Sequence, residues 1–273
     1  MIFFPFRDYP ESHLQIIVDS SRSPLKLEKF VLLRLRKNTV YSGRIDDQEA
    51  AFVLMRGKGK MWVDNVFLGE TGVRQSVFSS PAWSFYLPPH TSYRIEVQEE
   101  SEFAVVLADS GVTGSGKKTE ANFIRPEDVS IKRVGKDAYL RDVHTIIGSS
   151  FPANTFMVGE TFNQPGLWSS YPPHRHEKNQ PPQEYKLEEI YHYRFNPERG
   201  FGVQCLYTDD KQYENAYLVK NGDTLVIPRG YHPVVAAPGY SMYYFWSLAG
   251  ERRILSPYED PAHQWIHSEG KER

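Results

Sequence analysis

Two histidines one residue apart, His174 and His176, follow a pair of prolines in the second half of the chain. On a β-strand, residues i and i+2 point to the same side, so an extended backbone here would aim both imidazoles at one place. A third histidine, His232, follows a Pro-Arg-Gly turn much later, where a neighbouring strand could return it to the same place. Imidazole nitrogens with a carboxylate oxygen bind Zn²⁺, Mn²⁺ or Fe²⁺ and leave positions open for a substrate. We therefore predict a divalent metal centre built on these three histidines.

The carboxylate of this centre has four candidates, Glu177, Glu184, Glu188 and Glu189. The last two begin a strand-like run over residues 187–193, in which alternation puts them on opposite faces. The pattern alone does not say which face points toward the histidines, so the choice is open at this stage. A His-x-His pair by itself is more often exposed loop sequence than a metal site. The acidic strand and the distant His232 together favour the metal.

Short strand-like segments separated by turns run along most of the chain. Tyr and Phe number 17 and 16, and Gly and Pro number 19 each, which is typical of short strands and turns rather than long helices. The predicted strands of the first half are 30–36, 51–55, 61–67, 84–87, 93–97 and 103–108. Those of the second half are 129–134, 142–147, 155–162, 187–193, 200–207, 216–219, 224–227, 234–236 and 241–248. The sequence therefore predicts an all-β protein.

The two halves share an outline, because each has strands leading to a proline-containing turn with a histidine, His90 in one and His232 in the other. Between them lies 110–118, a Gly/Ser/Lys-rich segment without apolar periodicity, which is typical of a linker. We predict a duplicated β-barrel with domains 1–118 and 119–273. Only the second has the His-x-His pair, so only the second should hold a metal.

Two other motifs suggest chemistry and are given simpler interpretations. Residues 111–119 approximate a phosphate-binding loop, but Lys118 stands where a hydroxyl must meet Mg²⁺, and Pro126 interrupts the helix that should follow. Cys205 falls inside a strand-like segment and is predicted to be a buried small hydrophobe rather than a nucleophile. The remaining histidines considered are expected to be structural or exposed: His90, His144, His192, His263 and His267.

Charge and composition exclude several classes of protein. Lys+Arg of 32 against Asp+Glu of 34 leaves a net charge of −2, which does not suggest a nucleic-acid or membrane-surface partner. One cysteine allows no internal disulfide and fits a reducing compartment. The amino terminus lacks the features of a secretion signal, and no apolar run approaches the roughly 20 residues that span a bilayer. A cytoplasmic location is expected.

Most of residues 166–266 resembles the 5-deoxy-glucuronate isomerase family of myo-inositol catabolism, bicupin proteins related to the 5-keto-4-deoxyuronate isomerases. The segments that carry this resemblance are 166–176, 187–194, 200–209, 221–234, 238–250 and 260–265. The first half is similar to the family more loosely, chiefly at 72–78 and 86–88. The resemblance implies an all-β bicupin, two cupin β-barrels of the jelly-roll type with little helix, of which the N-terminal one is degenerate.

The resemblance also implies which four residues hold the metal. The family's ligands fall on His174, His176, Glu189 and His232, which selects Glu189 among the acidic candidates. The interval between His176 and Glu189 is longer than in the general cupin motif. Cys205 stands where a basic residue would be expected, which leaves any substrate contact from that position in doubt.

The implied reaction converts the aldehyde 5-deoxy-glucuronate into the ketone 5-dehydro-2-deoxy-gluconate, an aldose–ketose isomerisation aided by the metal. The substrate carboxylate requires a basic partner, for which Arg175 and Arg229 are candidates. The sequence identifies neither the catalytic base nor the metal. Three alternatives stay open: isomerisation of 5-keto-4-deoxyuronate, an Fe²⁺ cupin dioxygenase and a non-catalytic sugar-binding cupin. Related cupins often associate through their sheets, so a homo-oligomer would be in keeping with the family.

Overall fold

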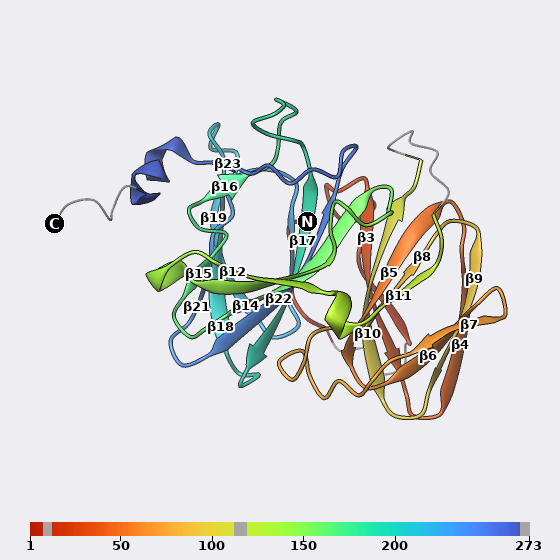
Figure 1. Cartoon of the computed structure of the whole chain (residues 1–273). Coiled ribbons are helices and arrows are strands. Elements are labelled where there is room, and N and C mark those ends of the chain that lie inside the picture. The colour runs from red at the N-terminus through yellow and green to blue at the C-terminus, as the bar shows by residue number, and fades with distance from the viewer. Residues whose placement is uncertain (8–12, 112–118, 268–273) are drawn as a thin grey trace.

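The computed structural model of this chain describes residues 1–7, 13–111 and 119–267. In this part of the chain the backbone forms five β-sheets and no α-helix. Figure 1 shows two β-rich halves, the first in red to yellow and the second in green to blue. Three short 3₁₀ helices complete the fold, η1 (Pro126–Asp128), η2 (Asp137–Tyr139) and η3 (Pro261–His267). The all-β, cupin-like class predicted from the sequence is confirmed.

The N-terminal half contains a six-stranded sheet that packs against a four-stranded sheet. The six strands are, in sheet order, β11 (Asn122–Ile124), β8 (Ser84–Leu87), β5 (Gln48–Arg56), β10 (Ser101–Asp109), β3 (Glu28–Leu35) and β2 (Leu14–Val18). The four are β4 (Thr39–Ile45), β9 (Thr91–Val97), β6 (Gly59–Val63) and β7 (Val66–Glu70). All pairings within these sheets are antiparallel, as short connections between strands allow.

The C-terminal half has the same plan with one larger sheet. Its seven strands are, in order, β1 (Phe3–Phe4), β20 (Thr224–Ile227), β17 (Glu188–Asn196), β22 (Ser241–Ala249), β14 (Phe156–Asn163), β13 (Arg141–Ile147) and β12 (Ser130–Val134). The opposing sheet contains β15 (Trp168–Ser169), β21 (Val234–Ala236), β18 (Phe201–Tyr207) and β19 (Glu214–Lys220). A two-stranded sheet joins β16 (His174–Arg175) to β23 (Tyr258–Glu259). Each half is thus a pair of opposed sheets rather than the closed barrel predicted from the sequence.

The two large sheets also pack against each other, so their central strands are buried on both faces. Along β5, Ala51 and Val53 join the core between the halves, whereas Phe52 and Leu54 join the core inside the N-terminal half. Burial on both faces explains why such strands are apolar along nearly their whole length instead of alternating. The apolar face of β17 follows the same rule, with Ile190 in the core between the halves.

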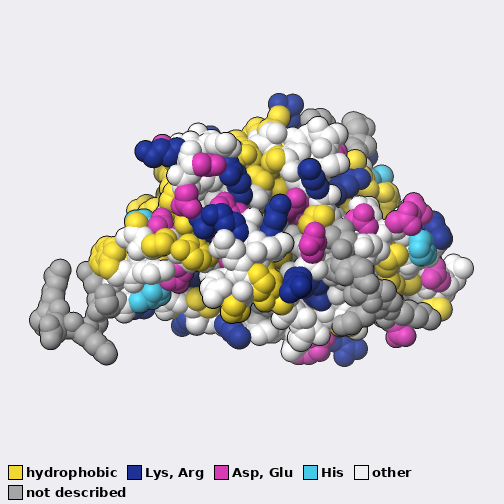
Figure 2. All heavy atoms as spheres, turned by 90° about the horizontal axis from the view of Figure 1, so that it is seen from above, with side chains coloured by type: hydrophobic (Ala, Val, Ile, Leu, Met, Phe, Trp, Pro, Cys, Tyr) yellow, Lys and Arg dark blue, Asp and Glu magenta, His cyan; other side chains and the backbone are white. Residues whose placement is uncertain are grey.

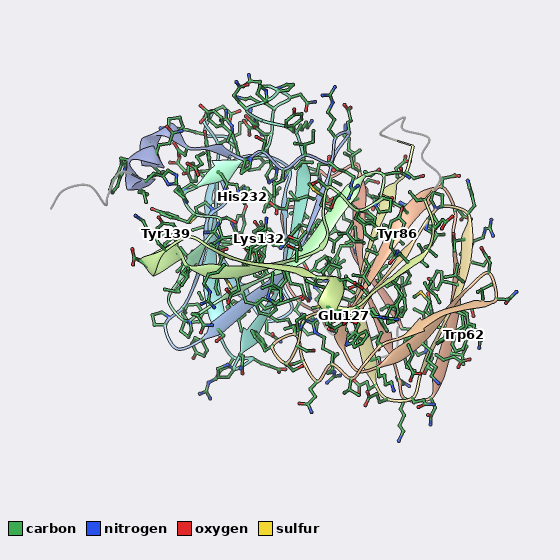
Figure 3. The ribbon with its side chains drawn as sticks, in the orientation of Figure 1. Trp62, Tyr86, Glu127, Lys132, Tyr139 and His232 are labelled. Atoms are coloured by element: carbon green, nitrogen blue, oxygen red, sulfur yellow. The ribbon has the colours of Figure 1, made fainter. Side chains whose placement is uncertain are left out.

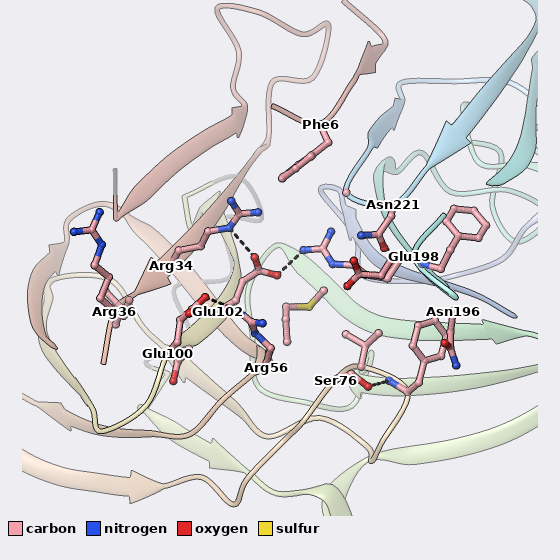
Figure 4. A pocket seen from close by; sticks show the side chains of 18 of the residues that line it. Phe6, Arg34, Arg36, Arg56, Ser76, Glu100, Glu102, Asn196, Glu198 and Asn221 are labelled. Carbon is pink, nitrogen blue, oxygen red and sulfur yellow. Dashed lines mark hydrogen bonds and ion pairs between the residues drawn. The ribbon is translucent and has the colours of Figure 1, made fainter. Parts of the chain in front are cut away.

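Polar contacts across the core between the halves reinforce this packing. A buried ion pair joins Arg74 of the first half to Glu160 of β14 at 2.8 Å, and both side chains are fully buried. At the rim of the same junction Glu102 of β10 accepts hydrogen bonds from Arg34 of β3 and Arg194 of β17 (Figure 4). The carboxylate of Glu102 therefore links three strands of the two large sheets.

The predicted domain boundary at 118/119 lies next to segment 112–118, outside the described residues, and it stays a prediction. Two strands pair across it: β1 joins β20 of the second half, and β11 joins β8 of the first. The predicted strand 61–67 is wrong in one respect, because the chain reverses there between β6 and β7. Asp64 and Asn65, at φ 46° and 67°, both adopt the left-handed conformation that tight hairpin turns require.

The charge on the surface and the length of the helices can be compared with the expectation of no nucleic-acid or membrane partner. Acidic and basic side chains are interspersed on the face seen from above in Figure 2. None of the helices in the described residues is long and apolar enough to cross a membrane.

Candidate metal centre

Three of the four predicted ligands meet inside the C-terminal half. Potential ligand atoms of His176, Glu189 and His232 all lie within 4.8 Å of one another, and all three residues are buried. One oxygen of Glu189, Oε2, lies 3.0 Å from Nε2 of His176 and 3.2 Å from Nε2 of His232. Figure 3 shows His232 in the interior of this half. Two imidazoles and a carboxylate converging on one point form a donor set suited to a divalent metal.

Each of these side chains is positioned by a different stretch of backbone. Glu189 lies near the start of β17, where its neighbour in β20 is Ile227. His232 follows β20 after a turn in which Gly230 has φ +94°. A Cβ on that glycine would lie 2.6 Å from the carbonyl oxygen of Tyr207, so only glycine fits this turn. The turn brings His232 back over the end of the strand that it has just left.

His174 lies on β16 and His176 directly follows this strand, where two hydrogen bonds to Leu187 hold it in place. Its carbonyl oxygen accepts a hydrogen bond from Leu187 N, and its Nδ1 donates to Leu187 O, both at 2.9 Å. His174 lies on the same side of the chain, as the i, i+2 spacing predicts. Its ring centroid is 4.9 Å from that of His232, and the corresponding distance for His176 is 5.1 Å. His174 therefore borders the three-residue cluster without belonging to it.

All three imidazoles present the same nitrogen to main-chain carbonyls. Nδ1 of His174, His176 and His232 lies 3.3, 2.9 and 2.9 Å from the carbonyl oxygens of Pro172, Leu187 and Gly230. Because a carbonyl can only accept, each Nδ1 must carry the hydrogen. Each neutral ring then has its lone pair on Nε2, the atom that can bind a metal.

This arrangement needs a cation at its centre. With Nδ1 protonated, the neutral rings of His176 and His232 direct lone pairs at the Glu189 oxygen, and acceptors that face one another repel. Nε2 of His232 is buried and has no hydrogen-bond partner. A proton on one ring or a metal ion between the groups would remove the conflict. The residues present therefore fit a divalent ion.

Burial and mutual contacts set the ionisation of the cluster and of His174 beside it. Burial alone would raise the pKa of Glu189, but its close contacts with the imidazoles of His176 and His232 outweigh burial and lower the pKa to about 2. Burial would lower the pKa of His176, yet the contact with Glu189 raises it. For His174, burial and then the neighbouring imidazoles lower the pKa well below its ordinary value. Glu189 thus stays ionised and His174 stays neutral, and the raised pKa of His176 favours a proton on that ring, which a bound metal ion would replace.

Two of the other acidic candidates, Glu188 and Glu184, have structural roles. Glu188 points to the opposite face of β17 from Glu189, and its Oε2 accepts hydrogen bonds from the backbone N–H groups of Lys26 and Leu27 at 2.8 and 2.9 Å. Glu184 accepts from the backbone N–H groups of Glu177 and Lys178. Alternation along β17 puts Glu188 and Glu189 on opposite faces. The structure shows that Glu189 lies on the face toward His176 and His232.

The two arginines predicted to bind a substrate carboxylate lie elsewhere. The guanidinium of Arg175 is buried, binds Asp209 and lies 3.6 and 3.5 Å from the carboxylates of Glu177 and Glu184. Alternation turns it away from its neighbours His174 and His176. Arg229 pairs with Asp210 at 3.0 Å on the surface. Neither arginine has a contact with the cluster in the described residues.

Comparison with known proteins identifies the family to which this arrangement belongs. A family described as KduI/IolB matches residues 6–266. The chain belongs to the KduI/IolB family. Relatives with the name 5-deoxy-glucuronate isomerase include one from Geobacillus thermodenitrificans, 39% identical over 234 residues, 85% of this chain and 81% of that protein. Another, from Bacillus subtilis strain 168, is 34% identical over 251 residues, 91% of each chain.

Solved structures give the same result for the fold. A crystal structure of an IolB-like protein from Salmonella typhimurium LT2 matches with a TM-score of 0.90 and 30% identity, over 98% of this chain and 99% of that one. The oxalate decarboxylase from Lactobacillus farciminis matches with a TM-score of 0.68 at 12% identity, over 98% and 90% of the two chains. The second likeness concerns the fold alone. The first extends across both halves of this KduI/IolB protein.

Hydroxyl groups surround the cluster on the inner face of this KduI/IolB half. Tyr191, two residues after Glu189, has its ring centroid 6.0 Å from that of His232, and its hydroxyl lies 2.8 Å from Ser170 Oγ. Ser170 is held at φ 51°, a conformation that non-glycine residues rarely adopt, at a cost of order 1–3 kcal/mol. Burial, followed by the charge of Glu189, raises the pKa of Tyr191 well above its ordinary value. Tyr191 is therefore a neutral hydroxyl donor next to the cluster.

The remaining predictions concern residues outside the cluster. Cys205 is half-buried and burial raises the pKa of its thiol, so the residue is unsuited to act as a thiolate nucleophile. His192 is fully buried, and its Nδ1 lies 2.8 Å from Thr224 Oγ1, which agrees with a structural role. The sequence did not single out Tyr191 or Arg141. The strand containing Arg141 was predicted to begin one residue later, so its inward position was missed.

Proposed function

We propose that this KduI/IolB protein is an aldose–ketose isomerase that converts 5-deoxy-glucuronate into 5-dehydro-2-deoxy-gluconate. The names of its relatives, which match over most of both chains, support this assignment. We further propose that a divalent metal ion is held by His176, Glu189 and His232, with His174 as the fourth ligand. The identity of the metal is left to experiment, because this ligand set suits Zn²⁺, Mn²⁺ and Fe²⁺.

One observation carries the metal proposal. Nδ1 of each of the three imidazoles faces a main-chain carbonyl, so that Nε2 of His176 and His232 points at the same oxygen of Glu189. Holding three rings in the same tautomer uses three separate loops, which a purely structural cluster would not require. Pre-set tautomers are a general feature of metal-ligating histidines.

The chemistry requires no oxidant. A proton leaves the carbon that carries the hydroxyl and a proton arrives at the former aldehyde carbon, while the oxygens exchange one proton. A divalent ion, when bound, would polarise the carbonyl and stabilise the negative charge that develops on the two oxygens.

The protein's own groups supply the rest. Tyr191, held by Ser170, can donate its hydroxyl proton to the oxygen that gains charge and recover a proton from the neighbouring oxygen. Buried apolar and aromatic residues around it, including Tyr193 and Leu248, exclude water from the reacting atoms. Exclusion of water strengthens each of these polar contacts.

The direct test is a turnover assay on protein reconstituted with Zn²⁺, Mn²⁺ or Fe²⁺. Loss of the aldehyde signal of 5-deoxy-glucuronate in the NMR spectrum, with appearance of the ketone, is expected with at least one of these metals. 5-Keto-4-deoxyuronate should be turned over at least tenfold more slowly. Faster turnover of that sugar, oxygen consumption, or sugar binding without product would each replace this proposal with one of the alternatives.

The predictions from the sequence about partners and location are retained as proposals. We expect the substrate to be a small uronate, with no nucleic-acid or membrane partner, and the protein to form a homo-oligomer in a cytoplasmic setting. Light scattering of the purified protein measures the oligomeric state directly.

A further inference from the structure

Arg141 differs from most arginines of the molecule in what its guanidinium binds. It lies at the start of β13 and is half-buried. Its Nη1 donates hydrogen bonds to the carbonyl oxygens of Tyr139 and Tyr171, both at 3.1 Å. In the described part of the chain neither its Nε nor its Nη2 has a partner, and no carboxylate pairs with it. One corner of the guanidinium is therefore fixed by the backbone, and the edge formed by Nε and Nη2 is left for another group.

The hydrogen bond to Tyr171 places the guanidinium of Arg141 next to the segment that carries the histidine pair. Tyr171, whose carbonyl it binds, is three residues before His174 in the segment that carries the histidine pair. Its neighbour on the same face of β13 is Val143, which packs against the core that contains Tyr191.

The surroundings of Arg141 suit a sugar. Tyr139 and Tyr171 have ring centroids 5.6 Å apart, and Tyr171 is 5.7 Å from Trp168. All three rings are half-buried. Figure 3 shows Tyr139 toward the outer edge of the half that contains His232. Aromatic rings of this kind offer an apolar face and a polar edge to a ligand that carries both hydroxyls and C–H groups.

We propose that Arg141, rather than Arg175 or Arg229, binds the carboxylate of the sugar-acid substrate. The inference rests on the proposed function for the identity of that substrate. A guanidinium whose Nε and Nη2 are both available binds a carboxylate through two parallel hydrogen bonds, the strongest geometry that a single side chain offers. The two arginines predicted from the sequence already have carboxylate partners. The carboxylate on Arg141 and the aldehyde at the cluster would then fix both ends of the substrate.

The test compares Arg141→Gln and Arg141→Lys with the wild type. Each metal-loaded protein is assayed with 5-deoxy-glucuronate and with 5-deoxy-glucose, the same aldehyde with a hydroxymethyl group in place of the carboxylate. We expect Arg141→Gln to raise the KM for the uronate by about 10- to 100-fold, the usual size for hydrogen bonds to a charged group. The kcat for the uronate and the kcat/KM for the neutral sugar should change by less than about threefold. Arg141→Lys, which keeps the charge and loses the paired donors, should lie between.

Arg133→Gln is the matched control, because Arg133 lies in the adjacent strand β12, is exposed and pairs with Asp142 at 2.8 Å. It should leave the discrimination between the two sugars unchanged. An unchanged ratio of uronate to neutral-sugar kcat/KM in Arg141→Gln would overturn the proposal. If the Gln variant does not fold, as judged by its circular dichroism and Tm, the same ratio in Arg141→Lys decides.

A binding experiment separates this inference from the proposed function. Gluconate has a carboxylate but no carbonyl to isomerise, and sorbitol is its neutral counterpart. Calorimetric titration should show gluconate binding to the wild type about 10- to 100-fold more tightly than to Arg141→Gln, with sorbitol unaffected. That result without isomerase activity would support the carboxylate site and reject the isomerase. Isomerase activity with equal gluconate affinity in both proteins would support the isomerase and reject the carboxylate site. Equal gluconate affinity without isomerase activity would reject both proposals.

Discussion

In the N-terminal half Ala50 pairs with Leu87 of β8 and Leu107 of β10. In the C-terminal half Glu189 pairs with Ile227 of β20 and Leu248 of β22. Strands β5 and β17 therefore occupy equivalent places, and the carboxylate of the metal cluster corresponds to a methyl group in the first half. The same backbone frame supports the cluster of His176, Glu189 and His232 in one half and an apolar core in the other.

The correspondence continues along the inner face. Two residues after Ala50 comes Phe52, which matches Tyr191 in the other half. A buried tyrosine hydroxyl needs a hydrogen-bond partner. The Tyr191 hydroxyl lies 2.8 Å from Ser170 Oγ, and the Tyr193 hydroxyl donates to Gln204 Oε1 at 2.8 Å. Phe52 requires only packing, because a phenyl ring has no hydrogen-bond donor to satisfy. The inner face of the first half is thus stabilised by packing alone at this position, whereas the second half also needs hydrogen bonds.

The turns that carry His90 and His232 differ in length, and this difference decides whether the histidine is exposed or buried. His90 follows Leu87 at the end of β8 by three positions, and its side chain is 69% exposed. His232 follows Ile227 at the end of β20 by five positions and is fully buried. The longer turn, with Gly230, is long enough to fold back over its own strand end. The shorter turn leaves its histidine outside.

Removing the carboxylate that distinguishes the halves should have the largest effect. Glu189→Ala leaves His176 and His232 without the negative charge between them, so the bound metal should be lost and kcat/KM should fall on the order of 10³-fold or more. Metal content by mass spectrometry and turnover of 5-deoxy-glucuronate measure both. Glu198→Ala, an exposed glutamate beyond the same strand, should match the wild type. Full metal occupancy and activity in Glu189→Ala would contradict the assignment.

The reciprocal exchange should damage the fold rather than create a site. Ala50→Glu places a carboxylate among apolar side chains with no histidine beside it. Burying an unpaired charge costs about 3–5 kcal/mol, which should lower the Tm by on the order of 10 °C. Ala216→Glu makes the same substitution at an exposed strand position of β19 and should change the Tm little. Calorimetry of both variants is the measurement, and equal Tm values would mean that the first half tolerates polar groups as the second does.

The junction between the halves should show its own pH dependence through Glu102. Burial alone would raise the pKa of Glu102, but the charges of Arg194 and Arg34 outweigh it and lower the pKa from 4.5 to about 2. A lowered folded-state pKa contributes stability that is present above pH 4.5 and is lost as the pH falls toward 2. This contribution is on the order of 3 kcal/mol.

Urea unfolding of Glu102→Gln at pH 7, 4.5 and 3 isolates that contribution. The variant should be less stable than the wild type at pH 7, and the difference should shrink as the pH falls. Glu100→Gln, which removes an exposed partner of Arg56, should cost less than about 1 kcal/mol at every pH. A difference for Glu102→Gln that does not vary with pH would rule out ionisation as its cause.

Making the inner faces more alike should have the smallest effect. Tyr191→Phe copies the residue of the first half and removes the hydroxyl donor next to the cluster. The kcat should fall by about 10- to 100-fold, while KM and metal content stay near their wild-type values. Tyr193→Phe removes a hydroxyl that binds Gln204, and it should lower stability by about 1 kcal/mol with less effect on kcat. Equal kcat values for the two variants would argue against a role for Tyr191 in proton transfer.

The strands and the donor types could be predicted from the sequence. Segments 84–87, 224–227 and 234–236 coincide with β8, β20 and β21, because runs of apolar and β-branched residues bounded by prolines and glycines indicate strands directly. The His-x-His spacing likewise predicts that two rings share a side, since the period of a strand is a local property. Alternation also separated Glu188 from Glu189 correctly.

Other features depended on contacts between residues far apart in the chain, and only the tertiary structure decided them. One is which face of β17 is turned toward His176 and His232. Another is which three main-chain carbonyls accept hydrogen bonds from the imidazole Nδ1 atoms. The arginines are the clearest case. Arg175 lies between the two histidines in sequence yet faces three carboxylates. Arg141 lies more than 30 residues before them and binds the carbonyl oxygen of Tyr171, in the segment that carries the histidine pair. Local sequence specifies which way a backbone runs. Which charged group meets which partner depends on how separate strands pack, because electrostatic contacts act through space.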